Sequence, residues 1–408
     1  MFDFSELSAA WNSSLPMFGE SLAAWVDGIA INSVIVMIMM LFMLWGAIDK
    51  IMGNKFGYGE QFEEGLNCMG PLAVSMAGVV AVAPILALVL NPIVGPIYNL
   101  VGADAAMFAT TLLACDMGGY PLAMQMAANE AIGNYAGLIL GSMMGPTIVF
   151  TIPVALGIID PEDRPYLGAG TLVGLVTIPV GCIAGGFVMN TTQYKLSVSE
   201  ILLNMIPVAI IALAIAAGLW FAPAAMMKGF DKFGTGVTIF ITAVTAIAIF
   251  EYNTGIVLPL FNLMMDDGTG VNGLESGLLT CGIIAIVLAG AYPMVKFVTD
   301  KFGGALEKVG SALGMNAAGS AGLVATLANN IAMFNILKDM NPKGKLLNCA
   351  FAVSAAFVFG DHLGFCAGNN SEMITPMIVG KLVAGILAVV LGNFMAPALL
   401  AKIPGAEK

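Results

Sequence analysis

A series of long apolar runs constrains the fold of this chain more than any other feature of its sequence. The runs are each roughly 20 residues long, the length that a helix needs to cross the hydrocarbon core of a bilayer. They lack the alternating pattern of membrane-spanning strands, so we predict helices. We identify about eleven candidates, near 31–48, 68–90, 105–127, 134–158, 166–189, 200–222, 236–260, 276–298, 313–336, 346–366 and 373–400.

The composition agrees with this interpretation. Of the 408 residues, 59% are hydrophobic and only 10% are charged, whereas soluble globular proteins carry about 25% charged residues. The 49 glycines favour close packing of membrane helices. We therefore predict an all-α, polytopic integral membrane protein with about 10–12 transmembrane helices.

Three of the runs contain residues that interrupt a helix. Gly118-Gly119 interrupts the third run, Asn329-Asn330 the ninth, and Gly360-Asp361 the tenth. Interrupted segments at matching places in two halves are typical of the broken helices of transporters. We therefore predict broken helices at these three points.

The two halves of the chain resemble each other. At one common offset Asp116 aligns with Asp361, Gly119 with Gly364, and Tyr120 with Phe365; further matches relate 62–78 to 306–322 and 143–146 to 373–376. We predict an internal duplication, inverted if all eleven runs cross the membrane. If the two Asp-bearing segments are re-entrant, the repeat becomes parallel, and the distribution of Lys and Arg modestly favours this second topology.

These patterns divide the chain into five parts. We predict an N-terminal interfacial segment at 1–30, a first transmembrane half at 31–190, intervening helices at 191–260, a second half at 261–402, and a tail at 403–408. The first segment is acidic, contains Trp11 and Trp25, and lacks the basic start of a secretory signal. Its aromatic residues suit a helix lying at the membrane surface.

Charge and motifs narrow the classes of function. The net charge of -11 suits a cationic solute and does not suit nucleic acid. We interpret the six cysteines as buried free thiols, and the single histidine cannot build a multi-histidine metal site. The sequence has no Walker A, GxGxxG, GxSxG or HExxH motif. We therefore expect no metal, no cofactor and no enzymatic activity.

The strongest candidates for a binding site are Asp116 and Asp361. A carboxylate at bilayer depth is costly and usually marks a binding site or a pathway. In a broken helix it can bind an ammonium group, and Tyr120 and Phe365 could place ring faces against the same cation. Alternatively, each aspartate caps a half-helix or pairs with a lysine.

Four further residues are candidates with simpler alternatives. His362 could relay protons or sense pH, or it could pack at the helix break. Glu251 lies in an apolar run and could line a path, or lie at a helix end. Asn329 and Asn369 could bind a hydroxyl group, or serve as helix caps.

At these residues the chain resembles the EutH family of ethanolamine permeases. The resemblance is carried by GEQFEEG at 59–65, TLLACDMGG at 111–119, GPTIVF at 145–150 and FGDHLGF at 359–365, and it covers roughly residues 30 to 400. It implies uptake of ethanolamine across the bacterial inner membrane. It implies no binding residues, so the candidates above depend on physical arguments alone.

Other functions remain open from the sequence. The protein could be a channel-like facilitator, a non-transporting sensor of a small amine, or a membrane enzyme acting on lipid head groups. The enzyme would need a nucleophile or metal cluster near the interface, and the sequence offers none. Besides ethanolamine and the lipid bilayer, a second copy of the chain in a homodimer is a possible partner.

Overall fold

The computed structural model of the protein describes residues 5–266, 270–403 and 405–406. Throughout these residues the regular structure is helical, and none of them forms a strand. The prediction of an all-α protein is confirmed. Part of the predicted tail, 404 and 407–408, lies outside the described residues.

Eight helical stretches among the described residues are long and apolar enough to cross a membrane. They correspond to eight of the predicted runs and confirm a multi-pass membrane protein. Several join consecutive labelled elements: Ile31–Ile51 (α2), Tyr58–Asn99 (α3 to α5), Glu130–Ile158 (α8 to α10), Pro161–Met189 (with α11, Arg164–Met189), Val198–Phe221 (α12), Pro223–Thr254 (α13), Gly273–Lys301 (the first part of α15, Gly273–Ala312) and Ser371–Leu400 (with α20, Ile374–Leu400).

The remaining three runs are those that contain the interrupting residues, and each folds as two short helices. The pairs are α6 (Ala106–Leu112) with α7 (Gly119–Met126), α16 (Ala317–Ala328) with α17 (Asn330–Asn335), and α18 (Pro342–Ala355) with α19 (Asp361–Asn369). The predicted broken helices are therefore confirmed. The internal repeat and its orientation stay predictions.

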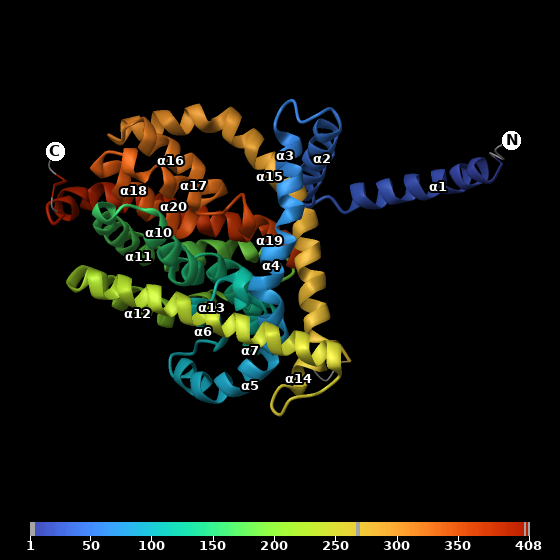
Figure 1. Ribbon diagram of the computed structural model, residues 1–408, viewed down its shortest axis with the longest axis horizontal. Coiled ribbons are helices and arrows are strands. Elements are labelled where there is room, and N and C mark those ends of the chain that lie inside the picture. Colours follow the sequence, from blue (N-terminus) through green and yellow to red (C-terminus); the bar gives the residue numbers. More distant parts are fainter. Residues whose placement is uncertain (1–4, 267–269, 404, 407–408) are drawn as a thin grey trace.

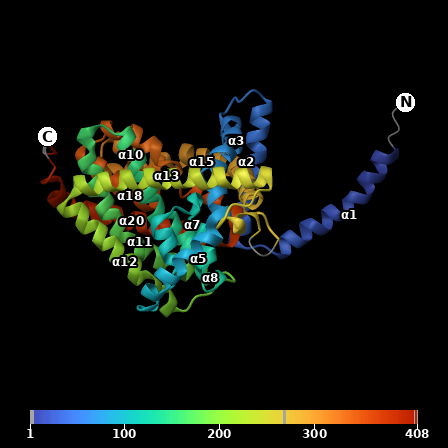
Figure 2. The ribbon, with the colours of Figure 1, turned by 60° about the horizontal axis from the view of Figure 1, so that its bottom comes forward.

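The N-terminal helix α1 (Ser5–Asp27) projects away from the rest of the molecule (Figures 1 and 2). Its side chains are almost all exposed, Trp11 among them at 66%. The predicted helix in segment 1–30 is present, although residues 1–4 lie outside the described part of the chain. Its placement at the membrane surface stays a prediction.

Glycines allow α11 to pack closely on α18 and α20. A Cβ atom added at Gly174 would lie 2.4 Å from the Cβ of Val353, and one at Gly181 would lie 2.4 Å from the carbonyl oxygen of Gly380. Such close contact between backbones is the usual way in which membrane helices gain packing energy. The three helices form a tight group (Figure 1) beside which the broken segments meet.

Two of the breaks face each other across this interior. The 3-10 turn Cys115–Met117 (η2), between α6 and α7, packs against α19 and against the π-helical turn Ala73–Ala77 (η1). Helix α15 packs along α19 and η1 on another side. The fold thereby brings residue 116 and residue 361 from the two halves of the chain to one place.

Candidate functional site

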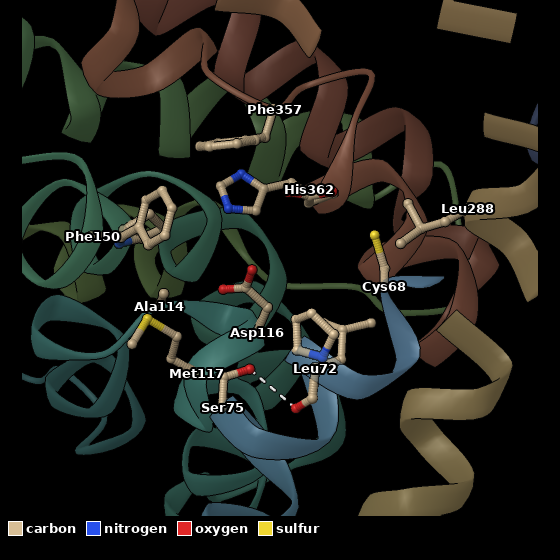
Figure 3. A pocket seen from close by; sticks show the side chains of 13 residues that line it. Cys68, Leu72, Ser75, Ala114, Asp116, Met117, Phe150, Leu288, Phe357 and His362 are labelled. Carbon is tan, nitrogen blue, oxygen red and sulfur yellow. Dashed lines mark hydrogen bonds between the residues drawn. The ribbon is translucent and has the colours of Figure 1, made fainter. Parts of the chain in front are cut away.

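A cavity of about 280 Å³ lies between the two Asp-bearing breaks. Asp116, Asp361 and His362 line it together with the aromatic rings of Phe150 and Phe357. Figure 3 shows the Asp116 carboxylate between His362 and the region of α4 (Met69–Leu72) and η1 that carries Leu72 and Ser75. Most of the other lining is apolar, so a charge in this space has few polar protein groups to solvate it.

The backbone around Asp116 depends on a glycine turn. Leu113 and Ala114 are extended, Cys115–Met117 forms a 3-10 turn, and Gly118 has a φ of +87°. A Cβ atom at Gly118 would also lie 2.0 Å from Val79 Cγ1. Only glycine meets both requirements without strain, so this turn fixes where the Asp116 carboxylate lies.

The backbone before Asp361 turns in a different way. Helix α18 ends at Ala355, and Phe357 has a φ of +62°, which is unusual for a bulky residue. Two hydrogen bonds to α16 hold the turn, from Phe357 N to Thr326 O at 3.1 Å and from Phe359 N to Leu327 O at 3.0 Å. Asp361 then begins α19 and points to the cavity.

The two carboxylates have different surroundings. The Tyr292 hydroxyl on α15 donates a hydrogen bond to Asp361 Oδ1, and Cys68 Sγ lies 3.3 Å from the same hydroxyl. No hydrogen bond joins the Asp116 carboxylate to another side chain among the described residues. Asp361 is therefore held in place, whereas Asp116 keeps its hydrogen-bonding capacity for a ligand.

A buried lysine, Lys381 of α20, completes the cluster. Its side chain is 1% exposed, its Nζ donates to the carbonyl oxygen of Ser142, and it lies 2.9 Å from His362 Nδ1. Our sequence reasoning missed this residue. The signal was available, because Lys381 stands inside the apolar run 373–400, where a charged side chain is costly.

The comparisons with known proteins agree on one family. A family model described as "Ethanolamine utilisation protein, EutH" matches residues 31–395. The chain belongs to the EutH family. Two relatives named "Probable ethanolamine permease EutH" are similar along nearly their whole length: one from Listeria monocytogenes at 51% identity over 93% of this chain and 98% of the relative, and one from Escherichia coli at 48% over 90% and 96%.

A relative from Bacillus subtilis named "Uncharacterized protein YxeR" is 46% identical over 91% of this chain and 97% of its own length. No solved structure matches the chain. Family membership, together with the eight apolar helices, places this EutH protein in the bacterial inner membrane as a multi-pass protein.

The aromatic pair predicted beside the aspartates lies outside the lining of this EutH cavity. Tyr120 and Phe365 contact each other edge to face, with ring centroids 5.9 Å apart. Tyr120 lines a second cavity of about 220 Å³ together with Asn369, whose side chain donates to the carbonyl of Phe365 at 2.8 Å. The two positions that the predicted repeat aligns therefore contact each other, and their role toward a substrate stays a prediction.

Two other predicted residues lie in structural positions. Asn329 is the N-cap of α17, where its Oδ1 accepts a hydrogen bond from Ile331 N at 2.8 Å. Glu251 is buried near the end of α13 and accepts from Leu258 N at 2.6 Å. Neither belongs to the lining of the central cavity. Their proposed binding roles stay predictions.

Three side chains of the EutH site have the chemistry of metal ligands. Ligand atoms of Cys115, Asp116 and His362 lie within 4.8 Å of one another. However, the ammonium of Lys381 already contacts one imidazole nitrogen and places a positive charge beside the group. All six cysteines are free. This arrangement suits a monovalent organic cation held by carboxylate oxygen better than a divalent metal ion.

Proposed function

We propose that this EutH protein transports ethanolamine, in its protonated form, across the bacterial inner membrane and binds it in the cavity between Asp116 and Asp361. The observation that carries the proposal is the Asp116 carboxylate, which faces an apolar cavity without a side-chain hydrogen-bond partner among the described residues. A carboxylate at membrane depth without compensation is costly. An ammonium group supplies that compensation through charge and hydrogen bonds.

The charges around the cavity favour a single monovalent cation. Two carboxylates, Asp116 and Asp361, stand against one ammonium, Lys381. When all three are ionised, the cluster has one negative charge in excess, and one ammonium substrate neutralises it. The rings of Phe150 and Phe357, with centroids 5.8 Å apart, offer faces to the same cation.

A neighbouring cavity suggests a route for the substrate. It has a volume of about 430 Å³ and shares Ser75, Met117 and Phe150 with the central cavity. Thr238 and Thr242 of α13 also line it, and their hydroxyls donate to the backbone carbonyls of Gly234 and Thr238. Hydroxyls used in this way keep lone pairs that accept from an ammonium group.

Counterflow in proteoliposomes tests the transport function. Vesicles loaded with unlabelled ethanolamine should take up labelled ethanolamine faster and to a higher transient level when they contain the protein. A channel-like facilitator would show protein-dependent uptake without this transient accumulation, and a sensor would show none. Loss of all protein-dependent movement in a folded preparation would refute the proposal of a transporter.

A further inference from the structure

We propose that His362, held in one tautomer by Lys381, donates a hydrogen bond to the hydroxyl group of the substrate and so selects vicinal amino alcohols over simple alkylamines. This inference rests on the proposed function, because it assigns the second polar group of the same substrate. It gives the cavity two distinct ends, a carboxylate for the ammonium and an imidazole N–H for the hydroxyl.

The contact with Lys381 determines which imidazole nitrogen carries the proton. In its ammonium form Lys381 has donors only, and in that form the 2.9 Å contact makes His362 Nδ1 the acceptor. A second donation to the carbonyl of Ser142 fixes the position of the Lys381 ammonium. In a neutral imidazole the proton then lies on Nε2. The imidazole also interacts with the backbone carbonyl of Ala356, and the NMR measurement described below tests whether this contact or Lys381 sets the tautomer.

The imidazole is oriented so that the Nε2–H group faces the cavity. The His362 ring contacts the ring of Phe357, with centroids 5.3 Å apart, and lines the cavity. In Figure 3 the ring nitrogen remote from the side-chain attachment points toward the Asp116 carboxylate. No side chain among the described residues forms a hydrogen bond with this nitrogen, so we assign its donor to the ligand.

The separation between donor and carboxylate fits a small bifunctional ligand. Ligand atoms of His362 and Asp116 lie within 4.8 Å of each other, and no direct hydrogen bond joins the two side chains. In the folded-over conformation of a vicinal amino alcohol, the ammonium and the hydroxyl oxygen are close neighbours. The ammonium can therefore bind Asp116 while the hydroxyl oxygen accepts from His362 Nε2–H. An alkylamine leaves that donor unsatisfied, which costs affinity.

The binding test compares ethanolamine with n-propylamine, which carries a methyl group in place of the hydroxyl. Affinities are measured on the purified full-length protein by calorimetry at neutral pH. For the wild-type protein we expect ethanolamine to bind about tenfold more tightly, as one net hydrogen bond allows. In His362→Leu the ratio should fall to about one while propylamine still binds, and in His362→Gln, which keeps a donor, part of the preference should remain.

Lys381→Met tests the positioning role. Removal of its positive charge beside Asp116 should strengthen the binding of both amines, whereas the preference for ethanolamine should fall because the imidazole is no longer held in one tautomer. Structural damage alone would not strengthen the binding of both amines while it lowers the preference for ethanolamine. The matched control is Lys402→Met, which removes the same charge from an exposed position just after α20; its affinities and its ratio should equal those of the wild type.

Because His362 is the single histidine of the chain, nitrogen NMR of ¹⁵N-histidine-labelled protein reports its tautomer without any mutation. We expect the Nε2–H form in the wild type and in Lys402→Met, and a mixture in Lys381→Met. An Nδ1–H form in the wild type, or an unchanged ethanolamine preference in His362→Leu, would overturn the inference. If the wild-type protein binds neither amine, the proposed function is refuted instead. The NMR measurement then still shows whether His362 carries its proton on Nε2.

Discussion

The two helix breaks that meet at the cavity carry the same acidic residue but differ in how they hold it. At the first break Asp116 lies in a 3-10 turn that ends at Gly118, and no other side chain among the described residues forms a hydrogen bond to its carboxylate. At the second break Asp361 begins a helix and accepts a hydrogen bond from Tyr292. Two similar sequence motifs thus yield one carboxylate free for a ligand and one fixed by the protein.

The backbone turns at the two breaks also differ. The first break uses glycine at φ +87°, which leaves no side chain at the turn, while the second uses Phe357 at φ +62°. A bulky residue in this region costs of order 1–3 kcal/mol. The strained position keeps an aromatic ring in the cavity against His362 and Phe150. The comparison teaches that the first break leaves a carboxylate without a side-chain partner among the described residues, as the proposed cation site requires, whereas the second supplies an aromatic wall.

Asp116→Asn should have the largest effect on substrate binding. The carboxylate contributes a charge-assisted hydrogen bond worth roughly 1.5–3 kcal/mol, so we expect ethanolamine affinity to fall by about 10–150-fold, toward the upper end of that range. Calorimetric titration of the purified protein measures this change. Asp300→Asn, at a half-exposed ion pair with Lys296, is the control and should bind normally. Near-normal ethanolamine affinity in Asp116→Asn would show that Asp116 has a structural role and does not bind the ammonium group.

Asp361→Asn should weaken binding by at least about tenfold, but less than Asp116→Asn. The amide oxygen of asparagine can still accept the hydrogen bond from Tyr292. The shape of the cavity wall is therefore retained, and only the negative charge of the carboxylate is lost. The same titration, with thermal melting to verify folding, checks the order of the two variants. If Asp361→Asn is the more damaging of the two, the assignment of the free carboxylate is reversed.

Tyr292→Phe should change ethanolamine affinity by only a few-fold. It should also remove the difference in hydrogen bonding between Asp116 and Asp361. Without the hydroxyl, Asp361 loses its fixed partner and becomes as free as Asp116 to bind an ammonium group. We expect the difference between Asp116→Asn and Asp361→Asn to become smaller in the Tyr292→Phe background. A double-mutant cycle measures this coupling. Additive effects would show that Tyr292 does not create the difference.

The smallest expected effect is that of pH on transport itself. Both breaks present carboxylates, which require a charged substrate, and an aliphatic ammonium stays protonated well above neutral pH. At fixed total ethanolamine, protein-dependent uptake should persist from pH about 8 to about 6, whereas leakage of the neutral base falls about tenfold per pH unit. Uptake of labelled ethanolamine into proteoliposomes, with empty liposomes subtracted, gives the protein-dependent part. If the protein-dependent uptake follows the concentration of neutral amine, the hypothesis that Asp116 and Asp361 bind a cation is wrong.

The sequence predicted much of the cavity because charged residues are rare in apolar runs. Asp116, Asp361 and His362 were identified from this rarity, and all three line one cavity. Lys381 has the same signal, but it was not among the candidates that our sequence reasoning selected. Tyr292 and Cys68 carry no comparable signal, since neither residue type is unusual in a membrane helix. Their importance depends on the packing of α15 along α19 and on the contact of Cys68, just before α4, with Tyr292.

The aromatic residues show where sequence spacing fails. Tyr120 stands four residues after Asp116, and Phe365 four residues after Asp361, so both were expected near the cation. The left-handed turn at Gly118 separates Asp116 from the start of α7, and Tyr120 then lies against Phe365. Spacing along the chain predicts a shared face only within an unbroken helix, and here the break intervenes.

By itself the sequence determined the membrane fold, the apolar runs of which eight become long helices among the described residues, and the positions of the three breaks. It could do so because hydrophobic length and helix-breaking residues act locally. Only the tertiary structure decided that Asp116 and Asp361 share a cavity, that Tyr292 bonds one of them, and that Lys381 contacts His362. The shared cavity joins residues from the two halves of the chain, whereas the other two contacts join residues 69 and 19 positions apart on separate helices. All of them depend on how closely glycine-bearing helices such as α11 allow their neighbours to pack.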